Sequence, residues 1–184
     1  MRADFTLYTP EYISGVMSLR KPQKKSLEIL DIIVNSVNLK KGMNLQAVLG
    51  AVKALYPTCT DFERDFMSLT FALATGVGKT RLMGAFIAYL YTQHNIKNFF
   101  VVAPNTTIYN KLCRDLNDNN SPKYVFRGLS CFVNAPQVIT GEDYRSKPLS
   151  LFQSEVRIFV FNISKFDKEN ANMKKVNEYY GESF

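Results

Sequence analysis

The stretch FALATGVGKTRL, residues 71–82, places a glycine-rich turn between an apolar run and a helix-like pattern. The run 69–74 is short and apolar, as in a buried strand, whereas 79–93 has the length and composition of a helix. Gly76 and Gly78 allow backbone conformations in which consecutive N–H groups point to one place. Because the following helix adds the positive end of its dipole there, the stretch predicts a cradle for phosphate groups.

Beyond this loop, short apolar runs alternate with helical segments, which indicates the class of fold. A helical pattern covers 106–117, and the loops around it are rich in Asn, Ser, Gly and Pro. Strands separated by helices favour a mostly parallel sheet covered by helices on both faces. The sequence therefore predicts an α/β fold. The apolar runs expected to supply its further strands are 98–103, 123–126, 137–140 and 156–161.

The first third of the chain has a helical pattern. Between residues 22 and 39, apolar side chains recur at three- and four-residue steps, the spacing of one helix face. A second helix is expected over 44–57, with Asn44 as its N-cap. We therefore divide the chain into an N-terminal helical segment, 1–67, and an α/β domain, 68–184.

Composition and charge limit the possible partners and the expected cellular location of the chain. The net charge is +7, from 23 Lys and Arg against 16 Asp and Glu, which allows an anionic partner. No apolar run approaches the roughly 20 residues of a membrane span, and the N-terminus lacks a signal-peptide pattern. Cys59, Cys113 and Cys131 are odd in number and lack zinc-site spacing, which fits reduced thiols. We expect a cytoplasmic protein without a membrane partner.

Individual residues of the loop have expected chemical tasks. The Lys79 ammonium would reach the β- and γ-phosphates of a nucleotide, and the Thr80 hydroxyl would bind the Mg²⁺ that bridges them. Leu73 stands where the widest form of the phosphate-loop pattern has its first glycine, so the match is incomplete. The residues expected to bind the nucleotide here are Thr75, Gly76, Val77, Gly78, Lys79, Thr80 and Arg81.

The same residues resemble those of a known family. LATGVGKT resembles motif I of superfamily 2 helicases and translocases, in the form common in restriction enzymes. LRKPQ, residues 19–23, resembles the L-R-x-x-Q element of that branch, whose glutamine recognises adenine. A primary amide suits that task because it donates and accepts hydrogen bonds together. The resemblance implies a RecA-like domain that binds ATP and Mg²⁺, with Gln23 on the adenine and Arg20 beside it.

Three downstream stretches follow in the order that this family has. FFVVAPNTTIYNKL (99–112) resembles motif Ia, QVITGED (137–143) resembles the next strand and turn, and VRIFVFNISKF (156–166) resembles motif Ib of type III restriction subunits. Lys111 stands where many relatives have glutamine, and Asn162 where many have threonine. The residues that the resemblance assigns to contacts with double-stranded DNA are Pro104, Asn105, Thr106, Asn162 and Lys165.

The acidic pair that this family uses for hydrolysis is missing. An Asp-Glu pair at a strand end should organise Mg²⁺ and the attacking water, and no apolar run here ends in one. The nearest acidic residues are out of order or away from a strand: Glu142, Asp143, Asp167 and Glu169. We expect the pair beyond Phe184. The chain would then be the N-terminal part of a longer ATP hydrolase, and would hydrolyse ATP slowly or not at all by itself.

The resemblance implies a DNA translocase motor, most like the restriction subunit of a type III enzyme, in which translocation is coupled to cleavage. Its implied partners are a second motor domain and a nuclease domain of the same longer chain, and a methyltransferase subunit. Two alternatives stay open, namely another phosphate-loop enzyme such as a kinase, or a non-catalytic nucleotide-binding fragment. The DNA sequence recognised, the direction of movement, the oligomeric state and the role of the helix at 44–57 are not indicated.

Several other residues have ordinary structural interpretations beside functional ones. His94, the only histidine, is expected at the solvated end of the loop helix, where it suits the helix dipole. Tyr89 and its neighbours on that helix are expected to pack rather than to stack on bases. The basic stretch RKPQKK at 20–25 fits either contacts to phosphates or a solvated helix start.

Overall fold

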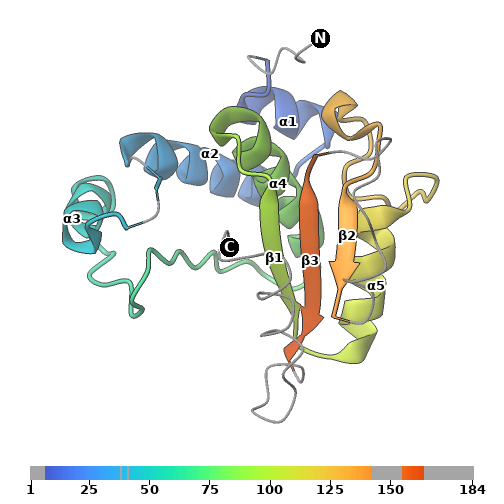
Figure 1. Ribbon diagram of the computed structural model, residues 1–184. Coiled ribbons are helices and arrows are strands. Elements are labelled where there is room, and N and C mark those ends of the chain that lie inside the picture. Colours follow the sequence, from blue (N-terminus) through green and yellow to red (C-terminus); the bar gives the residue numbers. More distant parts are fainter. Residues whose placement is uncertain (1–6, 38, 41, 142–154, 164–184) are drawn as a thin grey trace.

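The computed structural model describes residues 7–37, 39–40, 42–141 and 155–163. Within them a three-stranded parallel sheet has the order β1-β3-β2 (Figure 1). The register pairs Ala103 with Asn162 at one end of β1, and Arg157 lies between Asn98 and Gln137 at the other. The strands are β1 (Asn98–Ala103), β2 (Gln137–Thr140) and β3 (Arg157–Asn162).

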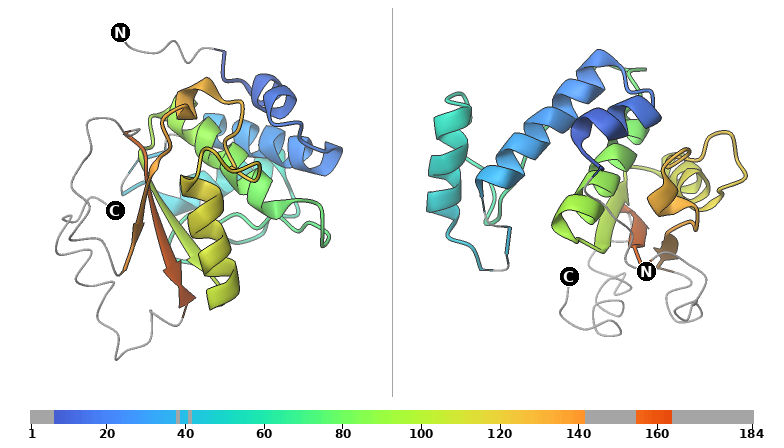
Figure 2. Two further views of the ribbon diagram at one scale, coloured as in Figure 1. Left: turned by 90° about the vertical axis from the view of Figure 1, so that its right-hand side faces the viewer. Right: turned by 90° about the horizontal axis from the view of Figure 1, so that it is seen from above.

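Helices precede the sheet in the chain and also connect its strands. In the two views of Figure 2, α4 and α5 lie on the same side of the sheet, while α3 lies away from the sheet beside the end of α2. None of the described helices is long and apolar enough to cross a membrane. The helices are α1 (Pro10–Val16), α2 (Lys21–Ser36), α3 (Leu45–Leu55), α4 (Lys79–His94), α5 (Thr106–Asn117) and the 3₁₀ turn η1 (Ser130–Phe132).

β3 is buried on both faces, as its continuous apolar sequence requires. Ile158 and Val160 belong to the main core, together with residues of α4 and α5. On the opposite face, the ring of Phe100 stacks on that of Phe161 with centroids 4.9 Å apart, and Phe159 lies beside them. The central strand therefore carries apolar packing on each side of the sheet.

α2 takes part in two separate apolar clusters. Leu27 and Leu30 pack into the main core with α1 and α4, so these N-terminal helices share the core of the sheet. Ile33 instead contacts a smaller cluster that includes Val48 and Val52 of α3. α3 starts where predicted, because the Asn44 side chain accepts hydrogen bonds from two N–H groups of its first turn.

Most predicted elements are confirmed with small shifts of their ends. The strand at 98–103 and the helix at 106–117 have the predicted bounds. The loop helix extends by one residue to His94, where Asn95 adopts the left-handed conformation that ends a helix well. The helices predicted at 22–39 and 44–57 form over Lys21–Ser36 and Leu45–Leu55.

Two predicted strands are wrong. The run 69–74 has no regular secondary structure and pairs with no strand in the described part of the chain, where β1 is an edge strand of the sheet. Its apolar side chains are used in packing instead, with the Phe71 ring 4.9 Å from that of Phe86. The run 123–126 forms turns, and Phe126 stacks on Phe132 at 4.1 Å, so these residues are buried without strand pairing.

One helix was not predicted. α1 begins at Pro10, and the Thr9 hydroxyl caps it by accepting from the Tyr12 N–H at 3.2 Å. Proline at the first position and Glu11 in the first turn are favourable start signals for a helix. The signal was therefore present in the sequence, but a helix of 7 residues is too short to show a clear apolar period.

Candidate nucleotide site

The phosphate loop lies directly before α4, and its backbone makes a sharp turn. Gly76 and Gly78 have φ angles of 78° and 96°, in the left-handed region that favours glycine. The Arg81 N–H donates to the Gly78 carbonyl at 3.0 Å, which begins the helix. In the described chain, the N–H groups of Gly78, Lys79 and Thr80 donate to no protein acceptor. Several donors at this helix start are therefore available to a ligand.

The first turn of α2 holds the loop from one side. The Gln23 side-chain amide donates through Nε2 to the Gly78 carbonyl at 2.8 Å and accepts through Oε1 from the Arg20 N–H at 2.7 Å. Gln23 is 2% exposed, so its amide is buried on the α2 side of both hydrogen bonds, whereas Arg20 and Gly78 are exposed. The predicted adenine-reading residue thus contacts the phosphate loop itself.

Two arginines add contacts between the same segments. The Arg20 guanidinium donates to the Gly76 carbonyl at 3.0 Å, and that of Arg81 donates to the Met17 carbonyl at 2.8 Å. The carbonyls of Gly76 and Gly78 are therefore occupied by Arg20 and Gln23, whereas N–H groups of the loop stay open. This distribution leaves a local excess of hydrogen-bond donors, which favours an anion.

Lys79 and Thr80 lie where the sequence places them, in the first turn of α4. Lys79 is exposed, and the Thr80 hydroxyl has no hydrogen bond within the described chain. No group of three His, Cys, Asp or Glu side chains suited to a metal occurs among the described residues. Thr80 could therefore hold Mg²⁺ only together with other ligands, such as phosphate oxygens.

The predicted DNA-contacting residues gather at the carboxyl end of the sheet. The Asn162 amide at the end of β3 donates to the Thr106 hydroxyl at 3.1 Å. The Asn105 side chain caps α5 by accepting from the Ile108 N–H at 2.9 Å. Pro104, Asn105 and Thr106 are exposed. Five further residues named from the sequence lie outside the described residues: Lys165, Glu142, Asp143, Asp167 and Glu169.

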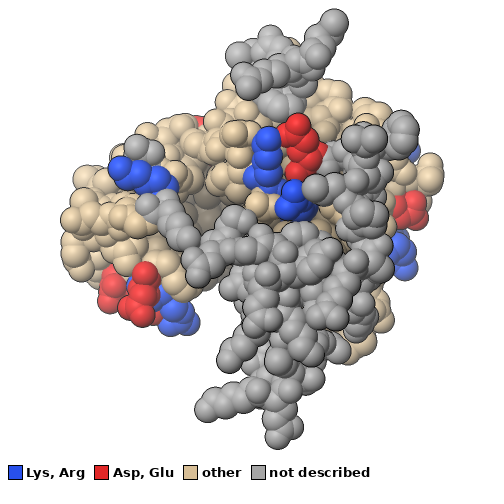
Figure 3. All heavy atoms as spheres, in the orientation of Figure 1, with Lys and Arg blue, Asp and Glu red and all other residues tan. Residues whose placement is uncertain are grey.

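The basic stretch at the start of α2 is largely engaged with other groups. Lys24 forms an ion pair with Glu11, and Lys25 lies 3.9 Å from Glu28. Figure 3 shows that, on the face drawn, lysine and arginine side chains form separate small groups, some of them beside acidic side chains. The described part of this face therefore has no continuous basic patch.

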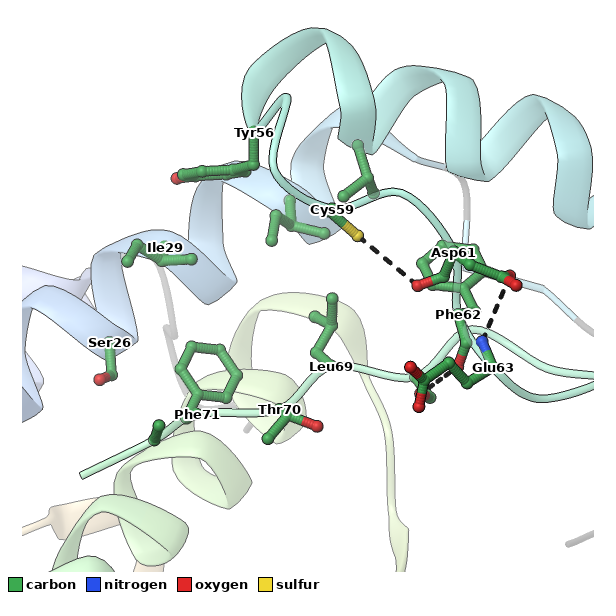
Figure 4. Close-up of a pocket in the computed structure, with 14 residues that line it drawn as sticks. Ser26, Ile29, Tyr56, Cys59, Asp61, Phe62, Glu63, Leu69, Thr70 and Phe71 are labelled. Carbon is green, nitrogen blue, oxygen red and sulfur yellow. Dashed lines mark hydrogen bonds between the residues drawn. The ribbon is translucent and has the colours of Figure 1, made fainter. Parts of the chain in front are cut away.

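A cavity of about 490 Å³ lies between α2, α3 and the segment 59–72 (Figure 4). Its wall includes the apolar side chains of Ile29 and Phe71, while Asp61 lies on the side of α3. The lining ends at Ala72, before the phosphate loop begins. The helix predicted at 44–57, α3, thus lines a pocket that is separate from the phosphate loop.

Sequence reasoning missed Gly84, on the second turn of α4. A Cβ at this position would lie 2.0 Å from Cγ1 of Val125, so only glycine allows the segment around Val125 to approach the helix. A glycine at a position of a helix where an apolar side chain is expected indicates that another segment packs closely there. The sequence does not identify that segment, because it is distant along the chain.

The glycine loop, the helix that follows it and the parallel sheet define an α/β protein of the RecA-like phosphate-loop class. The family model ResIII, described as "Type III restriction enzyme, res subunit", matches residues 16–183. The chain belongs to this family of ATP-dependent, helicase-like motors. No curated protein and no solved structure matches the chain.

Proposed function

We propose that the chain binds ATP with Mg²⁺ at the loop 75–81 and forms the nucleotide-binding part of a type III restriction motor. One observation carries the proposal. Arg20 and Gln23 occupy the carbonyls of Gly76 and Gly78, while N–H groups at the start of α4 have no acceptor among the residues that the structure describes. Donors without internal partners at a helix start suit the negative oxygens of a polyphosphate.

Each residue of the site has a task in this proposal. Lys79 binds the β- and γ-phosphates as a cation, and Thr80 shares Mg²⁺ with their oxygens. Gln23 reads the adenine edge, since an amide has two donor hydrogens and two acceptor lone pairs. The residue is 2% exposed and its side chain is bonded to Gly78 and Arg20, so contact with the base requires the side chain to become uncovered. The bound Mg²⁺ would neutralise charge on the phosphates.

The motor would use the nucleotide to move along double-stranded DNA. Pro104, Asn105 and Thr106 are exposed at the carboxyl end of the sheet, which fits contacts to the DNA backbone, and the buried Asn162 amide bonds to the Thr106 hydroxyl there. We propose that Lys165 adds to these contacts. Cleavage coupled to this movement would belong to a nuclease domain, and a second motor domain and a methyltransferase subunit would be partners.

Hydrolysis needs an Asp-Glu pair and an arginine from a second motor domain. No apolar run of the sequence ends in Asp-Glu. We therefore propose that this chain binds ATP but turns it over no faster than its Lys79→Ala variant. The test is phosphate release from ATP by purified chain, and turnover clearly above that variant would contradict it.

Thermal unfolding with and without ATP and Mg²⁺ tests the binding proposal. At ATP about tenfold above Kd, binding adds about 1.4 kcal/mol to the stability of the folded state, which raises Tm by about 3–6 °C. Lys79→Ala is expected to abolish the rise. Lys53→Ala, an exposed lysine of α3, is the matched control and should keep it. An unmutated chain whose Tm ignores millimolar ATP would overturn the proposal.

A further inference from the structure

A polar cluster joins α2 and α4 far from the phosphate loop. The Tyr89 hydroxyl donates a hydrogen bond to Oδ1 of Asp31. The Asn35 amide donates to the same Oδ1 at 2.8 Å and lies 3.3 Å from the Tyr89 oxygen, and Nε2 of His94 lies 3.3 Å from that oxygen as well. The cluster therefore brings together two residues of α2 and two of α4.

Tyr89 is buried, so its hydroxyl needs a hydrogen-bond partner within the protein. The residue is 1% exposed, and burial, helped by the hydrogen bond to Asp31, raises the pKa of the phenol. The hydroxyl therefore keeps its proton and remains a donor. Because a buried hydroxyl without a partner is costly, this bond favours one arrangement of the two helices over others.

The same two helices are also joined at the loop, through the Gln23 amide and the Gly78 carbonyl. Asp31 lies eight residues beyond Gln23 on α2, and Tyr89 lies eleven beyond Gly78, which correspond to about 12 Å and about 16 Å along the two helix axes. The helices therefore run in a similar direction with two polar connections along them. The Asp31–Tyr89 bond therefore adds a second, directional connection to the apolar packing of Leu27 and Leu30 that already joins α2 to α4.

We propose that Asp31 and Tyr89 are positioning residues for nucleotide recognition, which fix the adenine-reading end of α2 against the phosphate-binding end of α4. The inference rests on the proposed function, because it needs Gln23 to contact the base. Loss of the Asp31–Tyr89 bond then weakens recognition of the base more than recognition of the phosphates. The phosphates contact groups of the loop and α4, which α2 supports through Gln23, whereas the base contacts a side chain of α2 itself, so displacement of α2 affects the base contact more directly.

Calorimetric titration with two ligands tests the inference on the whole chain, each with Mg²⁺: ATP, and inorganic tripolyphosphate, which lacks the base. Tyr89→Phe and Asp31→Ala should each raise the Kd for ATP about fivefold, the effect of one lost hydrogen bond, and change that for tripolyphosphate less than about twofold. The double variant should be no worse than either single one. Asp31→Asn should restore ATP binding, because its amide oxygen still accepts from Tyr89.

Tyr56→Phe, which removes a hydroxyl at the end of α3, is the control and should change neither Kd. Equal weakening of both ligands, or no weakening of ATP, would overturn the positioning role. Gln23→Ala distinguishes failure of the positioning role from failure of base recognition. If it weakens ATP selectively while Tyr89→Phe and Asp31→Ala do not, only the positioning role fails. If the unmutated chain binds tripolyphosphate as tightly as ATP, base recognition fails, and the inference fails with it.

Discussion

The N-terminal ends of α4 and α5 make an instructive comparison, because each follows an extended segment and begins a helix. At α5, the Asn105 side chain accepts from the Ile108 N–H, and the Thr106 hydroxyl accepts from Asn162. At α4, glycine stands at the N-cap position and supplies no side-chain acceptor. A side chain therefore caps one N–H group at the start of α5, whereas no side chain caps an N–H group at the start of α4.

This difference distinguishes a helix start that can bind a ligand from an ordinary helix start. The loop before α4 is held from outside, by Gln23 and Arg20 of a segment that is 55 and 56 residues away in the sequence. Those contacts use carbonyl groups and leave the N–H donors open. A helix start that other elements support without capping its donors is suited to an anion.

The largest expected effect concerns the packing of α4 around Gly84 rather than its N-terminal end. Gly84→Ala places a Cβ 2.0 Å from Val125, so the packing of α4 must shift, and we expect a loss of about 3 kcal/mol of unfolding free energy. Gly50→Ala in α3, with nothing within 4 Å, is the control and should gain up to about 1 kcal/mol. Urea unfolding measures both. Equal stabilities would contradict the close approach.

Gly78→Ala should break the open helix start itself. The new Cβ would lie 2.8 Å from Nε2 of Gln23, at a φ of 96°, so the contact to α2 and the backbone turn are both strained. We expect a loss of about 2 kcal/mol of stability and of the ATP-induced rise in Tm. Gly76→Ala has a similar φ but no neighbour within 4 Å, so it should cost only about 1 kcal/mol. If Gly76→Ala costs as much as Gly78→Ala, the contact with Gln23 is unimportant.

Asn105→Ala removes the side-chain cap at the start of α5 and leaves the start of α4 unchanged. Loss of the cap should lower the unfolding free energy by about 1 kcal/mol, because the Ile108 N–H loses its acceptor. The ATP-induced rise in Tm should stay as in the unmutated chain. Thermal unfolding with and without ATP checks both, and a lost response to ATP would mean that the two helix starts are coupled.

The weakest interaction is expected with duplex DNA at the α5 end. Two or three phosphate contacts predict weak binding of duplex DNA whose affinity falls about 10- to 40-fold between roughly 50 and 200 mM salt. Binding should be indifferent to DNA sequence, because phosphate contacts carry no base information. Fluorescence anisotropy with two unrelated duplexes measures both properties. Affinity that ignores salt would speak against contacts of this kind.

The sequence was informative wherever the signal is local. The apolar run 98–103 and the Asn-capped pattern at 106–117 contain their own start and stop signals, and both elements form as predicted. The glycines, Lys79 and Thr80 of the loop were likewise identified from a short motif. The run 69–74 has the composition of a strand, but a strand also needs a partner, and none lies beside it in the described residues.

Contacts between distant segments were out of reach of sequence reasoning. Gln23 was assigned to adenine by resemblance, whereas its hydrogen bonds to Gly78 and Arg20 became visible only in three dimensions. Tyr89 was expected simply to pack in the core. It does so, with 1% of its surface exposed, but its hydroxyl also joins two helices through Asp31. A helical period identifies a buried face and does not name the residue that it meets.

The most direct test of the open helix start is an amide-resolved NMR titration of the chain with ATP and Mg²⁺. The account predicts that the N–H signals of Gly78, Lys79 and Thr80 shift most, and that those of Asn105–Ile108 stay in place. The Gln23 side-chain amide should shift as well, if it reads the base. Unmoved loop signals at saturating ATP, or equal shifts at both helix starts, would contradict the claim that the α4 start is the nucleotide site.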